Sequence, residues 1–292
     1  MTTFSLQNAQ LCAQISAHGA ELRSLKDNKN TEYMWSGDAA YWGRVSPVLF
    51  PFVGKTNDLR YRTHGKEYAM TQHGFARDRM FSLISATDTE LWFALDSDAE
   101  TLEKYPYPFH LELGYRLEND TLRVLWRVNN PSDSMLPFSI GGHPAFVCPL
   151  HAADDQNQYF LHFDTDTLCV TQLSERGLAT SETARLNLTG GYLPLDAHLF
   201  DHDALVIEHD QCHEVSLCLP NKKPYLTVTF DAPLFGIWSP PGKHAPFVCI
   251  EPWYGRCDAE GFSGELSERE WSNNLPAGGT FEASYCIRPC SE

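Results

Sequence analysis

The sequence predicts an all-β fold in which antiparallel strands form a large β-sandwich with few short helices. Three observations support this prediction. Apolar and polar residues alternate with a period of two in many short runs, clusters of proline, glycine, asparagine and aspartate separate these runs, and sustained helical periodicity is scarce. Because no linker or repeat divides the chain, we expect residues 1–292 to form a single domain.

The clearest strand signal is a hairpin between residues 111 and 128. Apolar residues occupy alternate positions over residues 111–117 and again over residues 122–128, and Glu118-Asn119-Asp120 between them suits a turn. Further runs of this kind lie at residues 81–84, 91–95, 215–219, 225–230 and 281–287. Many short strands at close intervals are typical of an all-β protein.

Two short segments are predicted to be helical. Residues 97–104 begin with a capping residue, Ser97, and carry Glu100 three positions later, as in a capping box. Pro106 ends this segment soon afterwards. A second short helix is expected to start near Ser267, because acidic residues follow in what would be its first turn.

Composition excludes several classes of function. The chain has 22 Lys and Arg against 38 Asp and Glu, and its formal net charge of −16 would repel the phosphates of nucleic acids and anionic lipids. No apolar run approaches the length that spans a membrane, and the N-terminus lacks the basic and apolar regions of a signal peptide. We therefore expect a cytoplasmic protein, monomeric or homodimeric, that does not act on nucleic acids or membranes.

Neither a disulfide framework nor a metal site is expected. The nine cysteines are scattered and form no C-x-x-C motif, and four of them lie in apolar runs where a thiol behaves as a small hydrophobe: Cys169, Cys218, Cys249 and Cys286. Asp201-His202-Asp203 resembles a cluster of metal ligands, but neighbouring residues on a strand point to opposite faces, so these side chains should not converge. The sequence also lacks a phosphate-binding loop, a dinucleotide fingerprint and a G-x-S-x-G motif, and we expect no cofactor.

The candidate acid–base group is Glu251. Residues 247–250 suit a buried strand, and we expect this strand to end at Glu251 because Pro252 cannot donate a ladder hydrogen bond. A carboxyl group in such a half-apolar setting pairs with a cation, becomes protonated, or acts as an acid or base on a ligand. An ion pair with Arg256 is the structural alternative. The aromatic residues that follow offer flat surfaces to a sugar: Trp253 and Tyr254.

Two histidines lie in polar stretches within otherwise apolar sequence. His73 and Arg77 stand four positions apart around Gly74, in a stretch that does not resemble a strand. His143 follows two glycines, and Pro144 keeps the backbone of His143 extended, so the imidazole should have a fixed direction. For each histidine, a hydrogen-bonded role within a loop is the structural alternative.

These motifs together resemble a known family. His73-Gly-Phe-Ala-Arg77, Gly141-Gly-His143-Pro-Ala-Phe and Ile250-Glu251-Pro-Trp253-Tyr-Gly255 occur in this order. From about Gly19 to the C-terminus, the sequence is similar to the aldose 1-epimerase (galactose mutarotase-like) superfamily, in particular its LacX-like branch. The resemblance implies a single antiparallel β-supersandwich that binds a free sugar in an open cleft and interconverts its α and β anomers, without a cofactor or metal.

The resemblance also implies roles for individual residues. Glu251 corresponds to the family's general base, His143 to its general acid, and His73 to a histidine that holds the sugar. Arg77 lies in the same motif as His73 and would be a further binding residue.

Two positions depart from the galactose mutarotase pattern. Lys55 falls where that pattern has a substrate-binding arginine, although Arg44 stands in a similar short motif, and a lysine keeps the charge but loses the bidentate fork. The sugar-binding aspartate of the family matches Asp203 best, with Asp201 and Asp196 as alternatives.

The residue types suit anomer exchange. A base removes the proton of the anomeric hydroxyl and an acid protonates the ring oxygen, so that the ring opens. Rotation about one carbon–carbon bond and closure then give the other anomer. We predict that Glu251 is the base and His143 the acid, and that Trp253 or Trp238 gives the sugar a face for stacking.

Other functions stay open from the sequence. A sugar-binding or sensing protein would keep the pocket without turnover, and a glycosidase or lyase would need a second carboxylate facing the same bond. A hexose 6-phosphate is a narrower alternative substrate, whose phosphate Arg77, Arg44 or Lys55 would bind. A monosaccharide is the expected partner of the epimerase.

Overall fold

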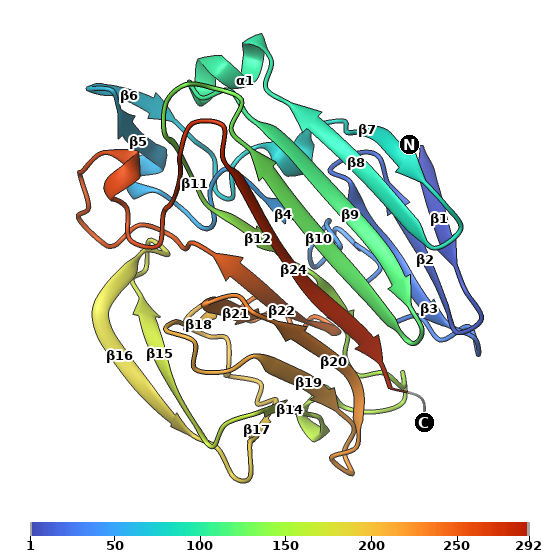
Figure 1. Ribbon diagram of the computed structural model, residues 1–292. Coiled ribbons are helices and arrows are strands. Elements are labelled where there is room, and N and C mark those ends of the chain that lie inside the picture. Colours follow the sequence, from blue (N-terminus) through green and yellow to red (C-terminus); the bar gives the residue numbers. More distant parts are fainter. Residues whose placement is uncertain (1, 291–292) are drawn as a thin grey trace.

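Two large antiparallel sheets form the body of the protein, whose computed structural model describes residues 2–290 (Figure 1). The nine-stranded sheet has the order β17 (Tyr192–Pro194), β14 (Phe160–Phe163), β19 (Glu214–Cys218), β20 (Pro224–Phe230), β24 (Thr280–Pro289), β10 (Thr121–Asn129), β9 (His110–Glu118), β8 (Glu90–Asp96) and β7 (Ser82–Ala86). The eight-stranded sheet has the order β16 (Ala179–Asn187), β15 (Thr167–Leu173), β18 (Leu205–Ile207), β21 (Leu234–Trp238), β22 (Phe247–Tyr254), β12 (Ile140–Gly142) and β4 (Val48–Leu49), with β13 (Ala145–Val147) also paired to β22.

Smaller elements surround these sheets. A three-stranded sheet comprises β1 (Thr3–Gln7), β2 (Leu11–Ser16) and β3 (Glu21–Asp27). Two further strand pairs are β5 (Arg60–Thr63) with β6 (Lys66–Ala69), and β11 (Leu136–Phe138) with β23 (Asn273–Leu275). The helical elements of the described residues are α1 (Ala99–Lys104) and the 3-10 turns η1 (Asn57–Leu59), η2 (Ala76–Asp78), η3 (Gln156–Gln158) and η4 (Leu266–Glu268). The antiparallel all-β prediction is therefore confirmed.

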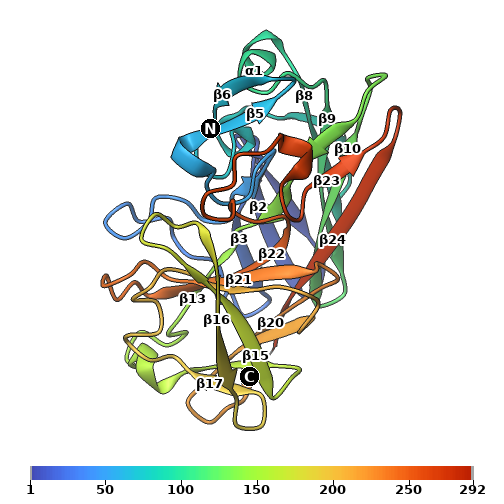
Figure 2. The same cartoon turned by 90° about the vertical axis from the view of Figure 1, so that its left-hand side faces the viewer.

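The main hydrophobic core lies between the two large sheets. The ring of Tyr254 on β22 lies 6.3 Å from Trp126 on β10 and 5.2 Å from Phe281 on β24, measured between centroids. In Figure 2, β21 and β22 accordingly lie beside the long strands of the other sheet. Burial alternates along β10, whose inward side chains belong to this core, as the predicted hairpin of residues 111–128 requires.

Strand β22 is buried on both faces. Val248 and Ile250 belong to the main core, and Tyr254 packs against it. The alternate residues 247, 249, 251 and 253 therefore lie on the opposite face of the sheet, where smaller apolar clusters include Phe247 and Trp253. This second face carries the candidate site.

The prediction that the strand ends at Glu251 is wrong. β22 continues to Tyr254, and Pro252 pairs with Phe235 of β21. On its other side, β22 pairs with β12 only at residues 253–254 and with β13 only at residues 247–249, so the ladder is open where Pro252 lies. A proline fits in this central strand because that position has no ladder hydrogen bond to donate there.

The predicted helices form with different caps and lengths. α1 begins one residue later than expected, since Asp98 rather than Ser97 is the N-cap and Thr101 rather than Glu100 completes the capping box. The segment near Ser267 forms only the single 3-10 turn η4. A membrane-spanning helix is not found among residues 2–290.

The cysteines are free thiols in every case, as predicted. Their burial differs from the prediction at two positions. Cys218 and Cys249 are buried, but Cys169 is exposed and Cys286 is only half-buried, because both lie at outward-facing positions of strands β15 and β24.

Candidate functional site

A cavity of about 680 Å³ opens on the second face of the eight-stranded sheet. Its size suits a small ligand, since such pockets measure roughly 300–1,000 Å³. Its walls include every residue predicted for the site: Lys55, His73, Arg77, His143, Asp203, Trp238, Glu251 and Trp253. Residues far apart in the sequence thus converge on one cavity, although their chemical roles stay predictions.

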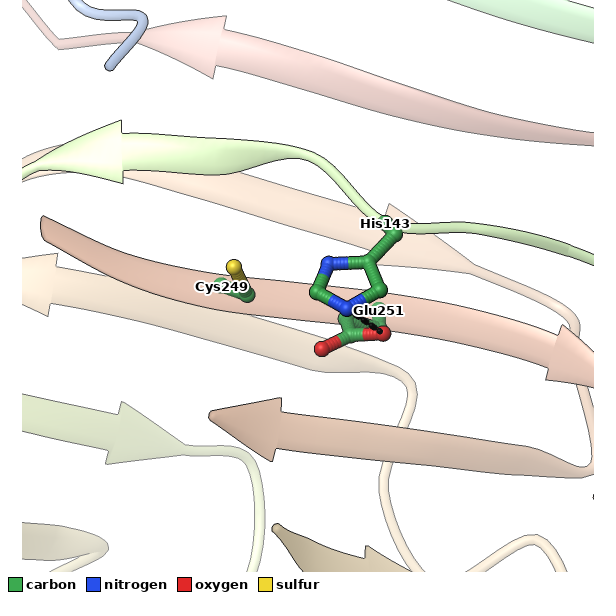
Figure 3. A group of neighbouring side chains, drawn as sticks. All are labelled: His143, Cys249 and Glu251. Atoms are coloured by element: carbon green, nitrogen blue, oxygen red, sulfur yellow. Dashed lines mark ion pairs between the residues drawn. The ribbon is translucent and has the colours of Figure 1, made fainter. Parts of the chain in front are cut away.

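His143 lies directly opposite Glu251 across an opening in the sheet. Gly141 pairs with Trp253 at one end of this opening, and Ala145 pairs with Cys249 at the other. His143 is midway between these pairs, where the register places Glu251. The Nε2 atom of His143 lies 3.4 Å from Oε2 of Glu251, as Figure 3 shows. The two glycines before His143 and the proline after it therefore belong to the break that lets an imidazole face the carboxyl group.

Burial alters the acidity of both groups. Glu251 is 1% exposed and His143 is 6% exposed. Burial raises the pKa of Glu251 well above its ordinary value, and the charge of Asp203 raises it further. Burial, reinforced by the positive charge of Arg77, lowers the pKa of His143 to about 3. Both side chains therefore favour their neutral forms, with one proton on the carboxyl group and an uncharged imidazole beside it.

The alternative ion pair between Glu251 and Arg256 does not form. Arg256 instead pairs with Glu208 and Glu270. The Oε2 atom of Glu251 and the Nδ1 atom of His143 are buried and have no hydrogen-bond partner among the described residues. Such atoms are uncommon in protein interiors and are frequent at functional sites, so the pair is available to a ligand.

A tight turn fixes the orientation of His73. Its backbone N–H donates to the carbonyl oxygen of Gly54 at 2.9 Å, and the N–H of Gly54 donates in return to Nδ1 of His73 at 3.1 Å. Because Nδ1 accepts, the proton of the neutral imidazole is on Nε2, which lies 3.1 Å from the side-chain amide of Gln72. Burial and the nearby His143 lower the pKa of His73 well below its ordinary value, so the ring is an uncharged hydrogen-bond donor. His73 is therefore both hydrogen-bonded within its loop and part of the cavity wall.

Three tryptophans form the aromatic wall of the cavity. Trp42 stacks on His143 with ring centroids 4.7 Å apart and an interplanar angle of 27°. Trp238 meets the same imidazole edge to face at 5.4 Å. The indole of Trp253 lies over Gly236 of the neighbouring strand β21. A Cβ atom at Gly236 would come within 2.4 Å of this ring, so the glycine leaves room for it. The sequence did not single out Trp42 for the site; its position just before Arg44, in a proline-broken apolar run, was the available signal.

Positive groups line another part of the cavity. Arg77 donates from Nη2 to the carbonyl oxygen of Gln72 at 2.6 Å, while its Nε atom is buried without a hydrogen-bond partner among the described residues. Arg44, at the cavity wall, pairs with Asp78 at 2.9 Å. Burial and the charge of Arg44 lower the pKa of Arg77 to about 10, so the guanidinium group of Arg77 is charged at neutral pH. Lys55 donates to the carbonyl oxygen of Arg176 at 3.3 Å.

The acidic segment of residues 201–203 lies in a turn and not in a strand. Asp203 has φ of 75° and precedes β18, which begins at Leu205. Asp201, His202 and Asp203 all line the cavity and were wrongly expected to lie on a strand, but their ligand atoms do not form a cluster among the described residues. Asp196, the remaining alternative for the sugar-binding aspartate, is not among the lining residues.

A buried ion-pair network holds the chain segment that follows β22, next to the cavity. Arg269 pairs with Asp258 at 2.5 Å, and both side chains are 3% exposed. Arg269 also donates to the carbonyl oxygen of Arg256 at 2.9 Å, which joins this pair to the one made by Arg256 and Glu208. These contacts hold the chain just after β22, and they leave Glu251 free of a basic partner.

The sequence is similar to those of known proteins. The model of the aldose 1-epimerase family matches residues 2–266. The chromosomal protein LacX of Lactococcus lactis subsp. lactis is 33% identical over 263 residues, which cover 87% of this chain and 88% of that protein.

Two solved structures share the fold. A galactose mutarotase related enzyme from Lactobacillus acidophilus is 32% identical, with a TM-score of 0.93 over 99% of this chain and 98% of its own. A galactose mutarotase-like protein from Lactobacillus casei is 31% identical, with a TM-score of 0.91 over 98% of this chain and 99% of its own. With its β-sandwich, its cavity and its similarity to LacX, the chain belongs to the aldose 1-epimerase family.

Proposed function

We propose that the protein is an aldose 1-epimerase that interconverts the α and β anomers of a free aldohexose. The observation that carries this proposal is the placement of His143 opposite Glu251, with 3.4 Å between Nε2 and Oε2, in a cavity walled by tryptophans. An acid and a base that face the same small volume can act on two oxygens of one sugar. Membership of the aldose 1-epimerase family supports the same activity.

The reaction needs one proton shared between the two side chains. The carboxylate of Glu251 takes the proton of the anomeric hydroxyl, the bond between the anomeric carbon and the ring oxygen breaks, and His143 gives its proton to that ring oxygen. The open-chain aldehyde rotates about its first carbon–carbon bond. When the ring closes on the other face of the aldehyde, the attacking hydroxyl returns its proton to His143, and Glu251 returns its proton to the anomeric oxygen. The enzyme therefore ends in its starting state.

The proton must be on His143 when the ring opens by this route. Burial favours the opposite arrangement, in which Glu251 carries it. The short separation of Nε2 and Oε2 allows the proton to pass between them as the sugar displaces water and supplies hydrogen bonds to the carboxylate. The neutral pair thus stores the proton that the imidazolium later delivers.

The remaining side chains bind the sugar in this proposal. His73 offers its Nε2 proton to a hydroxyl that takes the place of the Gln72 side-chain amide, Arg77 and Asp203 contact further hydroxyls, and Lys55 lies at the cavity wall. Trp238 and Trp253 present apolar surface to the sugar ring, which stacks its C–H groups on aromatic faces.

A hexose 6-phosphate is the second candidate substrate. Arg44 and Arg77 favour it, because two charged guanidinium groups line one part of the cavity and the Nε atom of Arg77 has no hydrogen-bond partner among the described residues. Guanidinium groups bind phosphate oxygens through paired hydrogen bonds. The sugar-binding alternative without turnover is less well supported, because it gives no role to the facing acid and base.

Polarimetry of freshly dissolved sugars tests the proposal. We expect wild-type protein to accelerate the mutarotation of α-glucose or α-galactose above the buffer rate, and Glu251→Gln to abolish the acceleration. A parallel assay of a hexose 6-phosphate, in which NMR follows the exchange of its anomeric signals, separates the two candidate substrates. Sugar binding detected by calorimetry without acceleration of any of these reactions would contradict the proposal and would support a binding protein.

A further inference from the structure

Cys249 lies beside the facing pair. It alternates with Glu251 along β22, so both side chains project from the same face of the sheet. One ligand atom each from His143, Cys249 and Glu251 lies within 4.8 Å of the other two, and all three residues are buried. Figure 3 shows the sulfur atom of Cys249 to one side of the imidazole of His143, with the carboxyl group of Glu251 next to the same ring. No step of the proposed epimerase mechanism uses this thiol.

We propose that these three residues form an inhibitory binding site for a thiophilic divalent cation such as Zn²⁺ or Cd²⁺. A thiolate, an imidazole and a carboxylate are the ligand types of zinc sites that keep a fourth position open. In a tetrahedral site with a metal–nitrogen and a metal–oxygen bond of about 2.0–2.1 Å, the nitrogen and oxygen atoms are about 3.3–3.4 Å apart. The observed separation of Nε2 and Oε2 is 3.4 Å.

The sulfur atom needs only a small movement to join them. Tetrahedral coordination places a sulfur ligand about 3.6 Å from the other ligand atoms. Because the three ligand atoms lie within 4.8 Å of one another, the sulfur approaches by at most about 1.2 Å. A rotation of the Cys249 side chain can supply this. The fourth position then faces the cavity, because His143 and Glu251 line it while Cys249 lies behind them. Water, or a hydroxyl group of a sugar, would complete the coordination.

Charge balance favours binding of a divalent cation at this buried site. Binding forms one bond from the metal to each of the sulfur, nitrogen and oxygen atoms, and it releases the thiol proton and the carboxyl proton to solvent. The thiolate and carboxylate cancel the two charges of the cation, so the filled site adds no net charge to the protein interior. Arg44 and Arg77 repel a free cation, but this neutral complex carries no such penalty. His143 is uncharged, which is the form that ligates.

The expected consequence is competitive inhibition. The metal would occupy both groups of the facing pair, so it would exclude sugar and remove the acid and base together. This site does not include the Asp201-His202-Asp203 turn, which contributes no ligand atom to the group.

Cadmium titration of the whole protein tests this proposal without an activity assay, because Cd²⁺–thiolate bonds absorb in the ultraviolet. We expect one equivalent of Cd²⁺ to produce this absorption in wild-type protein, and Cys249→Ala to lose it. Cys218→Ala is the matched control, since Cys218 is a buried strand thiol outside the cavity lining, and it should keep the absorption. Comparing these variants cancels the contribution of the other thiols.

A second variant keeps the thiol and removes a ligand. Glu251→Gln should weaken Cd²⁺ binding by at least about tenfold, as loss of one metal–oxygen bond requires. Circular dichroism of each variant would verify that it is folded. Equal Cd²⁺ absorption in wild type and Cys249→Ala, or none in wild type, would overturn the proposal. Because this readout does not measure mutarotation, its failure is distinct from failure of the proposed epimerase function.

Discussion

The Nε2 atom of His143 lies 3.4 Å from Oε2 of Glu251, and the two residues occupy facing positions where pairing of β22 with β12 ends and pairing with β13 begins. The break in the ladder has two effects. It leaves room for an imidazole between neighbouring strands, and it removes the need for a backbone donor where Pro252 follows Glu251. The same local irregularity therefore places both groups that the proposed reaction requires.

Trp42 is predicted to position His143. Its indole stacks on the imidazole at 4.7 Å, and such aromatic contacts are worth about 0.5–1.5 kcal/mol. Trp42→Leu should therefore lower kcat by about 2- to 12-fold. Trp42→Phe retains a flat ring and should restore most of the loss. Steady-state kinetics of the two variants check this, and equal loss in both would show that stacking is not the cause.

Stability at acid pH should depend on His143. The imidazole has an ordinary pKa of 6.5 and a pKa of about 3 in the folded protein. Between these values the unfolded chain binds a proton that the folded chain does not, so stability is present above pH 6.5 and is lost as the pH falls. The loss is up to about 1.4 kcal/mol per pH unit. Urea unfolding of wild type and His143→Asn at several pH values measures it, and the variant should show the shallower decline.

His110 supplies a control of opposite sign. Burial lowers its pKa, but hydrogen bonds with Asp96 and Glu112 raise it by more, so the net shift is upward. Its contribution to stability is therefore present below the unfolded pKa and is lost as the pH rises through the folded pKa. His110→Asn should therefore remove a loss of stability that occurs as the pH rises above 6.5, and it should leave the slope of the decline between pH 3 and 6.5 unchanged. If His110→Asn flattened that decline as much as His143→Asn does, this account of His143 would be wrong.

Gly74→Ala should destabilise the turn that carries His73. Gly74 has φ of 70°, and a Cβ atom there would lie 2.3 Å from the carbonyl oxygen of Phe50. Gly65→Ala is a matched control, because Gly65 has φ of 69° and no atom lies within 4 Å of its added Cβ. The control should cost about 1 kcal/mol for its backbone conformation, and Gly74→Ala should cost clearly more. Thermal unfolding compares them, and similar losses would refute the close approach.

Much of the fold was predictable because its determinants are local. The hairpin of β9 and β10 follows from alternation of side chains, and the stretch around His73 and Gly74 lacks this alternation and forms no strand. Three motifs also indicated the site through their resemblance to a family. These signals identify residue types and their order along the chain.

The remainder depends on contacts between distant segments. The continuation of β22 through Pro252 follows from where β12 and β13 pair with it, which the sequence of β22 does not contain. Likewise, Trp42 reaches His143 only because the folded chain brings their segments together. Arg256 was an equally plausible partner for Glu251 until Glu208, from another strand connection, was seen to pair with it.

Loss of a buried ion pair should destabilise the support of the cavity. Arg269→Met leaves the Asp258 carboxylate buried without its partner and should cost about 3–5 kcal/mol. Asp258→Asn combined with Arg269→Met should recover part of this loss, because it removes the uncompensated charge. The exposed pair of Arg176 and Asp58 is the control, and Arg176→Met should cost about 0–1 kcal/mol. Denaturant titrations measure all of these, and equal costs for the two single variants would contradict the prediction.

The most direct test of the central claim is the rate of anomer exchange at equilibrium, measured by NMR exchange spectroscopy on an accepted sugar. We expect wild-type protein to exchange the anomeric signals rapidly, and Glu251→Gln and His143→Asn each to slow exchange by about 10²–10⁴-fold while calorimetry shows that the sugar still binds. Exchange at the wild-type rate in either folded variant would contradict the claim that this facing pair carries the proton transfers.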